Sequence, residues 1–120
     1  MRETVDSDPV SVVNEYFSRM RARDLRVVEL FHDDASLSGL GAQRCGRAAI
    51  LEFYRDVINR AGPSPRRAGP LLAEGPRVAA EIYIDLPNGA TIHAVDLFHI
   101  EDGLIRSLTY FIASEARTST

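Results

Sequence analysis

The chain has 120 residues, a formal net charge of −3 and 45% hydrophobic residues, which together predict a single soluble globular domain. The basic residues are scattered and the net charge is negative, so we expect no nucleic-acid partner. All 14 lysine-or-arginine positions hold arginine, which excludes Schiff-base chemistry on a lysine. No segment approaches membrane-spanning length, so no membrane association is expected.

The few cysteine and histidine residues indicate the cellular compartment and limit the metal chemistry that we expect. The single cysteine, Cys45, excludes an internal disulfide and is typical of a reducing compartment. No apolar run of the signal-peptide type occurs at the start of the chain, so the sequence predicts a cytoplasmic protein. We expect no metal and no cofactor, because His32, His93, His99 and Cys45 share no ligand spacing and no phosphate-binding loop is present.

The N-terminal part of the chain predicts two helices after a flexible segment over residues 1–8. Asp8 and Pro9 form an N-cap followed by proline at the first helical position. Apolar residues then recur at helical spacing, namely Val12, Val13, Tyr16, Phe17 and Met20. Asp24 caps a second, short helix, which the pair Asp33-Asp34 is expected to end.

The middle of the chain predicts a short strand and a third helix. The strand covers residues 35–40 and runs into a glycine-rich bend. The helix covers residues 47–60 and is stopped by Gly62-Pro63. Residues 62–70 contain three of the six prolines and predict a linker, which leads to an edge strand near Leu71-Leu72.

Three β-rich runs follow, over residues 77–86, 90–100 and 104–113, and residues 114–120 are expected to be a tail. The runs are separated by turn sequences at 87–89 and 101–103, which predict an antiparallel meander. A two-residue first turn would place Glu81 opposite Asp96, which is an unfavourable pair of like charges. A three-residue turn instead places Ala80, Ile82 and Ile84 on the face of Asp96, and the next hairpin adds Leu108, Tyr110 and Ile112 to it.

These elements predict one α+β domain over residues 9–113, in which three helices pack against a cone-shaped, curved antiparallel sheet. The unusual residue on the inner face of that sheet is Asp96, which alternates with Ile92, Ala94, Phe98 and Ile100. A buried carboxyl group must find donors, keep its proton or line a polar hole in the core. Asp96 therefore indicates either a pocket or a purely structural hydrogen bond.

Four short sequences follow one another along the chain, namely Val12-Val13 through Tyr16, Leu30-Phe31-His32-Asp33-Asp34-Ala35, Gly46-Arg47-Ala48-Ala49-Ile50-Leu51-Glu52-Phe53-Tyr54 and Val95-Asp96-Leu97-Phe98. In this order they resemble the nuclear transport factor 2-like superfamily and its SnoaL-like branch of polyketide cyclases and ketosteroid isomerases. The resemblance covers residues 9–113.

The resemblance implies roles for individual residues. In ketosteroid isomerase a tyrosine and a protonated aspartic acid form an oxyanion hole while a second aspartate moves a proton. Tyr16 and Asp96 match the oxyanion pair and are the expected catalytic residues, and Tyr54 matches a tyrosine that supports the first. The position of the proton-moving aspartate holds Gly39, which has no group to titrate. General-base catalysis typically contributes about 10²–10⁴-fold, so strict isomerase activity is doubtful.

A small apolar ligand with a carbonyl or phenol group, steroid-like or polyketide-like, is the expected partner. The residues expected to contact it share a place on the inner side of the fold, and they are Tyr54, Phe31, Phe98, Leu108, Tyr110, Ile112, Ile82 and Gly39. His93 and His99 alternate with Asp96 and are expected to face away from the pocket.

Three hypotheses for the function remain open from the sequence. The first is an isomerase or cyclase that uses Tyr16 and Asp96, with Tyr110, the substrate or water moving the proton. The second is a module that binds the same ligand without chemistry. The third is an interaction protein that forms a homodimer through the outer face of the sheet, where apolar and charged side chains mix.

Overall fold

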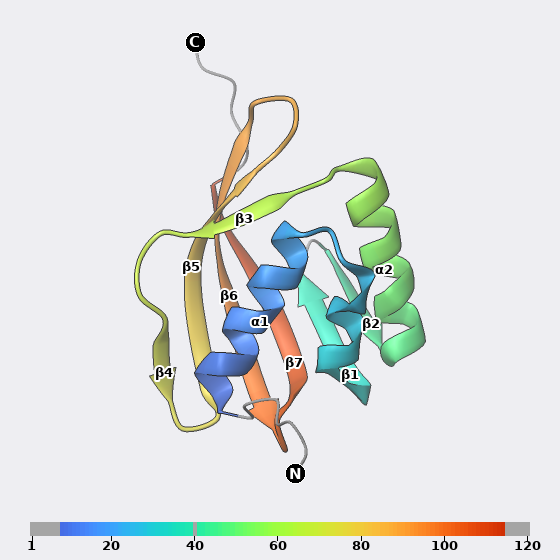
Figure 1. Ribbon diagram of the computed structural model, residues 1–120, viewed down its shortest axis with the longest axis vertical. Helices are drawn as coiled ribbons and strands as arrows, with labels where there is room; N and C mark the ends of the chain where they lie inside the picture. The colour runs from blue at the N-terminus through green and yellow to red at the C-terminus, as the bar shows by residue number, and fades with distance from the viewer. Residues whose placement is uncertain (1–7, 40, 115–120) are drawn as a thin grey trace.

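The computed structural model describes residues 8–39 and 41–114 of the chain. Two α-helices, one 3₁₀-helix and seven strands follow one another (Figure 1), in the order α1 (Pro9–Arg21), η1 (Leu25–Leu30), β1 (Phe31–Gly39), β2 (Ala42–Cys45), α2 (Arg47–Arg60), β3 (Ser64–Arg67), β4 (Leu72–Glu74), β5 (Arg77–Asp85), β6 (Thr91–Glu101) and β7 (Leu104–Ser114). No helix among the described residues is long and apolar enough to cross a membrane.

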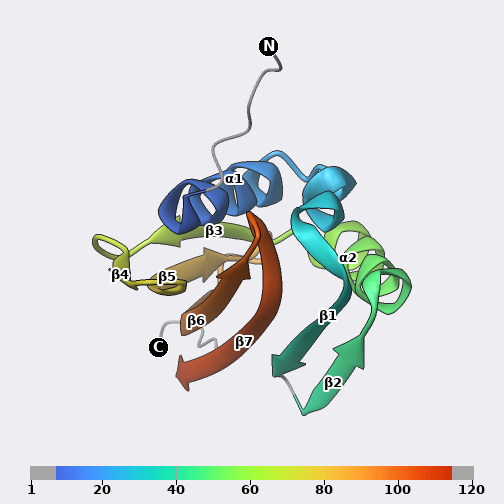
Figure 2. The same cartoon turned by 90° about the horizontal axis from the view of Figure 1, so that it is seen from below.

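All seven strands belong to one sheet, with the order β2-β1-β7-β6-β5-β3 and with β4 paired to β5. Every pair is antiparallel except β1 with β7, which is parallel. Figure 2 shows that β7 is strongly curved, that α1 lies across one side of the sheet, and that α2 lies beside β1 and β2. The predicted α+β fold with a curved, open sheet is confirmed.

The predicted register of the meander is also confirmed. Ala80 lies opposite Asp96 and Ile82 opposite Ala94, and the Leu86 amide donates to the Ala90 carbonyl at 2.9 Å, which closes a three-residue turn. On the other side of β6, Asp96 lies opposite Tyr110. Because one face of each strand is buried, a slip by one residue would move every apolar side chain of the strand to solvent.

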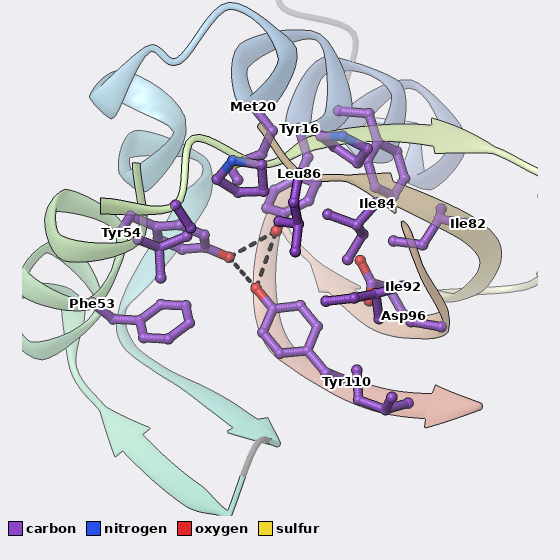
Figure 3. A pocket seen from close by; sticks show the side chains of 17 residues that line it. Tyr16, Met20, Phe53, Tyr54, Ile82, Ile84, Leu86, Ile92, Asp96 and Tyr110 are labelled. Carbon is purple, nitrogen blue, oxygen red and sulfur yellow. Dashed lines mark hydrogen bonds between the residues drawn. The ribbon is translucent and has the colours of Figure 1, made fainter. Parts of the chain in front are cut away.

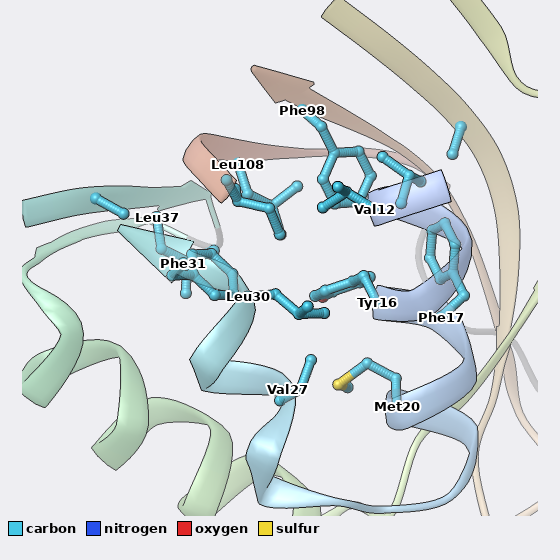
Figure 4. Packing of buried hydrophobic residues seen from close by; sticks show 14 of the residues in the cluster. Val12, Tyr16, Phe17, Met20, Val27, Leu30, Phe31, Leu37, Phe98 and Leu108 are labelled. Carbon is cyan, nitrogen blue, oxygen red and sulfur yellow. The ribbon is translucent and has the colours of Figure 1, made fainter. Parts of the chain in front are cut away.

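Helix α1 forms where capping and apolar spacing agree. The Asp8 carboxylate accepts a hydrogen bond from the Ser11 amide at 3.3 Å, and Pro9 occupies the first turn, where its missing N–H costs nothing. The predicted stripe is buried, and Figure 4 shows it packed toward Phe98 and Leu108 of the sheet. Val27 and Leu30 of η1 pack against the same core from the side, so α1 lies between η1 and the sheet.

Three local predictions are corrected by the structure. The short helix ends at Leu30 rather than at Asp33-Asp34, because strand β1 already begins at Phe31. Asp33 and Asp34 lie in that strand and their exposed carboxylates pair with Arg47 and Arg106. Residues 42–45, for which no strand was predicted, pair with β1 as strand β2.

The proline-rich segment after α2 is not simply a linker. Ser64–Arg67 pairs with β5 as strand β3, at the edge of the sheet. A proline is tolerated in an edge strand because its missing N–H can face away from the neighbouring strand. Residues 1–7 and 115–120, predicted to be a flexible start and a tail, and Leu40, predicted to end a strand, lie outside the described residues.

Candidate functional site

A cavity of about 230 Å³ lies between the two α-helices and the inner face of the sheet (Figure 3). Seventeen residues line it, and only four of them carry a hydroxyl or carboxyl group, namely Tyr16, Tyr54, Asp96 and Tyr110. The other lining side chains are aliphatic, aromatic or proline, together with Met20. A mostly apolar hollow with a few convergent polar groups is the usual form of a small-molecule site.

The three tyrosine hydroxyls meet at one point in the wall of the cavity. The Tyr16 hydroxyl lies 2.8 Å from that of Tyr54 and 3.2 Å from that of Tyr110, and the Tyr54 and Tyr110 hydroxyls are 2.7 Å apart. Figure 3 shows this triangle of dashed lines, which we call the tyrosine triad. Its members come from α1, α2 and β7, so the triad exists only when all three elements have packed.

Asp96 lies close to the triad because of the sheet register. On β6 it is directly opposite Tyr110 on β7 and Ala80 on β5. Its side chain is 2% exposed, and its Oδ1 atom has no hydrogen-bond partner among the described residues. The Tyr16 hydroxyl pairs with the other two tyrosines rather than with Asp96.

Burial controls the protonation of all four groups. Loss of hydration raises the pKa of the Asp96 carboxyl well above its usual value. Burial, and then the neighbouring Tyr110 and Tyr54, raise the pKa of Tyr16, while burial raises the pKa of Tyr54 and of Tyr110. No arginine lines the cavity, and the more distant Arg44 lowers the pKa of Tyr110 by less than burial raises it. Burial thus favours the uncharged form of all four acids, in which they donate hydrogen bonds rather than act as bases.

The residues predicted to contact a ligand divide into two groups. Six of the predicted site residues line the cavity, namely Tyr16, Tyr54, Ile82, Asp96, Tyr110 and Ile112. Phe31, Phe98 and Leu108 do not line it: their side chains are fully buried in the core beneath, where Phe98 packs edge-on against Tyr16 at 5.2 Å between ring centroids. These three residues support the site from behind.

Sequence reasoning missed part of the cavity wall. Phe53 and Val57 of α2 line it, and so do Pro63 and Pro65 next to and within β3. Val57 follows Tyr54 by three residues on a helix, so its position on the same face could have been inferred. Pro65 could not, because β3 was not predicted and only its pairing with β5 brings it to the cavity.

Gly39 also lies away from the cavity lining. It has a backbone φ of +137°, and a Cβ atom built on it would lie 2.8 Å from the Tyr110 Cβ and 3.0 Å from the Tyr110 carbonyl oxygen. Real Cβ atoms do not approach so closely. The absence of a side chain at Gly39 therefore leaves the space that Tyr110 occupies.

The three histidines lie outside the cavity lining. His93 Nε2 is 2.7 Å from the Glu81 carboxylate on the outer face of the sheet, and its ring stacks on Tyr83. His32 Nε2 lies 2.6 Å from the Glu101 carbonyl oxygen. Within residues 8–39 and 41–114, no group of three or more histidine, cysteine and acidic side chains is arranged to hold a metal ion.

A family model described as SnoaL-like domain matches residues 13–108, which is most of the chain. The chain belongs to the SnoaL-like domain family. This SnoaL-like protein has no match among curated proteins.

Solved structures of the nuclear transport factor 2-like fold resemble this SnoaL-like protein closely in shape and weakly in sequence. A candidate polyketide cyclase from Sinorhizobium meliloti is 24% identical, with a TM-score of 0.76 over 82% of this chain and 92% of the other. A candidate ketosteroid isomerase from Kribbella flavida is 21% identical, with a TM-score of 0.78 over 93% of this chain and 82% of the other. An LEH-like epoxide hydrolase of M. tuberculosis is 18% identical, with a TM-score of 0.77 over 87% of this chain and 81% of the other.

The raised pKa of Asp96 has a consequence for the stability of this SnoaL-like protein. Above pH about 4 the unfolded chain releases the Asp96 proton while the folded chain keeps it. Folding then binds a proton, so we expect this group to lower the free energy of unfolding as pH rises, by up to about 1.4 kcal/mol per pH unit, until the folded pKa is passed.

Urea denaturation of the wild type and of Asp96→Asn at a series of pH values measures this effect as the difference between the two proteins. Exposed carboxyl groups with lowered pKa, such as Asp34 and Asp85, are common to both and cancel. An infrared band of a protonated carboxyl group that is lost in Asp96→Asn is expected at pH 7. A carboxylate at that pH in the ligand-free protein would contradict the assignment.

A second expectation concerns Gly39→Asp, the substitution that would place a carboxylate where the resemblance puts the proton-moving aspartate. We expect it to destabilise the fold rather than create a base, because of the contact with Tyr110 and the positive φ. The backbone conformation alone costs about 1–3 kcal/mol.

Urea denaturation and a Δ5-3-ketosteroid isomerase assay measure the outcome of Gly39→Asp. Gly41→Asp is the matched control, since Gly41 also has a positive φ, of +78°, but has open space around its Cβ position. A folded Gly39→Asp variant that is as stable as Gly41→Asp and gains isomerase turnover would contradict this expectation. It would show that Tyr110 can move to make room for the new side chain.

Proposed function

We propose that this SnoaL-like protein binds a compact, uncharged and mostly apolar molecule that carries a carbonyl or phenol oxygen. The observation that carries the proposal is the buried Asp96 carboxyl group, which lines a mostly apolar cavity and has one oxygen without a hydrogen-bond partner among the described residues. A buried polar group without a partner costs about 1–3 kcal/mol, and a ligand oxygen would remove that cost.

The volume of the cavity favours a ligand of one or two rings. A cavity of about 150 Å³ binds benzene, and sites for drug-sized molecules have about 300–1,000 Å³. The cavity of about 230 Å³ lies between these limits. A four-ring steroid would have to leave part of its skeleton outside, so a small polyketide-like aromatic is the better fit.

The polar groups favour an uncharged ligand. No cation lines the cavity, and an ionised ligand would lose its hydration without gaining an ion pair. A protonated Asp96 donates a hydrogen bond to a carbonyl or phenol oxygen, which orients the ligand with its oxygen toward β6 and its rings toward the aliphatic side chains of Ile84 and Ile92.

Isomerase-type turnover is the less favoured version of this proposal. All the titratable groups that line the cavity are acids whose pKa is raised, so none of them is poised as a base at neutral pH. Without a basic side chain in the cavity, proton transfer would require a substrate acidic enough to release its proton unaided. We therefore propose binding as the primary activity.

Titration with 2-naphthol, followed by tyrosine fluorescence because the chain has no tryptophan, tests the proposal. Replacing Asp96 by leucine or Tyr16 by phenylalanine is expected to weaken binding about threefold to tenfold, the range for one net hydrogen bond. Equilenin, with four rings, is expected to bind more weakly than 2-naphthol in the wild type.

Two matched variants control for general effects of the substitutions. Tyr83→Phe removes a hydroxyl on the outer face of the sheet, and Asp102→Asn removes a charge at an exposed turn whose positive φ suits asparagine. Both should bind 2-naphthol as the wild type does. The proposal fails if no compound of the series binds, or if binding is unaffected by the changes at Asp96 and Tyr16.

A second candidate function, a homodimer that uses the outer face of the sheet, is supported by apolar side chains there. Phe111 is 53% exposed, and Val95 lies opposite it on β6 while Leu97 follows on the same face. Polar side chains such as Glu81 and His93 surround them. Such a mixture is typical of a moderately polar interface between copies of a chain.

Analytical ultracentrifugation of Leu97→Glu tests the homodimer. A charge at the centre of β6 would be buried without a partner in the interface, so we expect the dimer to dissociate at least tenfold more readily. Ala48→Glu, which adds the same charge at an exposed position of α2, is the control and should leave the association unchanged. A wild-type chain that is monomeric at all concentrations would remove this candidate.

A further inference from the structure

The hydroxyl protons of the tyrosine triad can be counted. Each tyrosine hydroxyl has one proton to donate, and the triad contains three hydroxyls and three contacts at hydrogen-bond distance. A ring in which every hydroxyl donates to the next uses all three protons. In this closed state no phenol of the triad has a proton left for a ligand, and each oxygen offers only a lone pair.

Tyr110 is the member that closes the ring. With Tyr16 and Tyr54 alone, one hydroxyl would donate to the other and one proton would always remain free. The hydroxyl of Tyr110 reaches both of them because its backbone packs directly on Gly39, where any larger residue would collide with it. The glycine and the third tyrosine therefore form one structural unit.

We propose that Tyr110 is a specificity-determining residue that withholds the Tyr16 hydroxyl from ligands that can only accept a hydrogen bond. This inference rests on the proposed binding function of the cavity. A ketone must break one contact of the ring, the longest being that between Tyr16 and Tyr110 at 3.2 Å, before Tyr16 can donate to it. A phenol avoids this cost, because its own hydroxyl donates to a lone pair of the intact ring.

The affinities of three ligands with the same two-ring skeleton test the inference in the wild type and in Tyr110→Phe. The ligands are naphthalene, 2-naphthol and 2-acetylnaphthalene. Opening the ring frees one phenol proton, so Tyr110→Phe is expected to bind 2-acetylnaphthalene about threefold to tenfold more tightly, the range for one net hydrogen bond. Naphthalene reports any change in packing and should bind equally, and 2-naphthol should gain less than the ketone.

The outcomes separate this inference from the function on which it rests. Binding of 2-naphthol that depends on Asp96, with no gain for 2-acetylnaphthalene in Tyr110→Phe, would overturn the role of Tyr110 and leave the binding function standing. Tyr83→Phe is the control for loss of a tyrosine hydroxyl outside the cavity, and it should change none of the three affinities.

A measurement without ligand tests the ring itself. Removing one hydroxyl from a closed ring breaks two contacts, and removing a second breaks only the one that remains. The loss of stability in the double variant Tyr16→Phe/Tyr110→Phe is therefore expected to be clearly smaller than the sum of the losses in the single variants. Additive losses would overturn the closed ring even if no ligand bound.

Discussion

The register of strand β6 is the constraint on which the site depends. It places the Asp96 carboxyl group on the inner face of the sheet, directly between Ala80 and Tyr110 on the neighbouring strands. Burial in this position raises the pKa of the carboxyl group, which favours its protonated form, and one of its oxygens has no hydrogen-bond partner among the described residues. A protonated carboxyl group is a hydrogen-bond donor inside a mostly apolar wall.

The cost of burying Asp96 is a reason to regard it as functional. A leucine of similar size would remove a buried polar group and would pack against the same neighbours. The surrounding aliphatic side chains supply no donor or acceptor to it. Proteins tend to retain such locally unfavourable groups at sites where they act on a ligand.

The packing of Tyr110 on Gly39 is a second constraint on the site. A Cβ atom at Gly39 would collide with Tyr110, so the glycine leaves room for this tyrosine on β7. The hydroxyl of that tyrosine joins those of Tyr16 and Tyr54 in a shared cluster. The cluster therefore depends on a glycine that lies outside the cavity lining.

Much of this architecture follows from the sequence alone, because local signals agree with the packing. Capping at Asp8, the apolar stripe of α1 and the alternation along β5 and β6 determine the helices, the meander register and the inward position of Asp96. Strands β2 and β3 carry no such signal, since their pairing partners lie far away or across a glycine-rich turn.

Only the tertiary structure decided how the polar groups pair. Alternation and helical spacing place Tyr16, Tyr54 and Tyr110 on inward faces, but the distances between their hydroxyls depend on how α1, α2 and β7 pack together. The same packing places Phe31 and Phe98 in the core, whereas the sequence predicted them in the cavity wall. A side chain's direction is a local property, whereas its partner is set by contacts between elements distant in the chain.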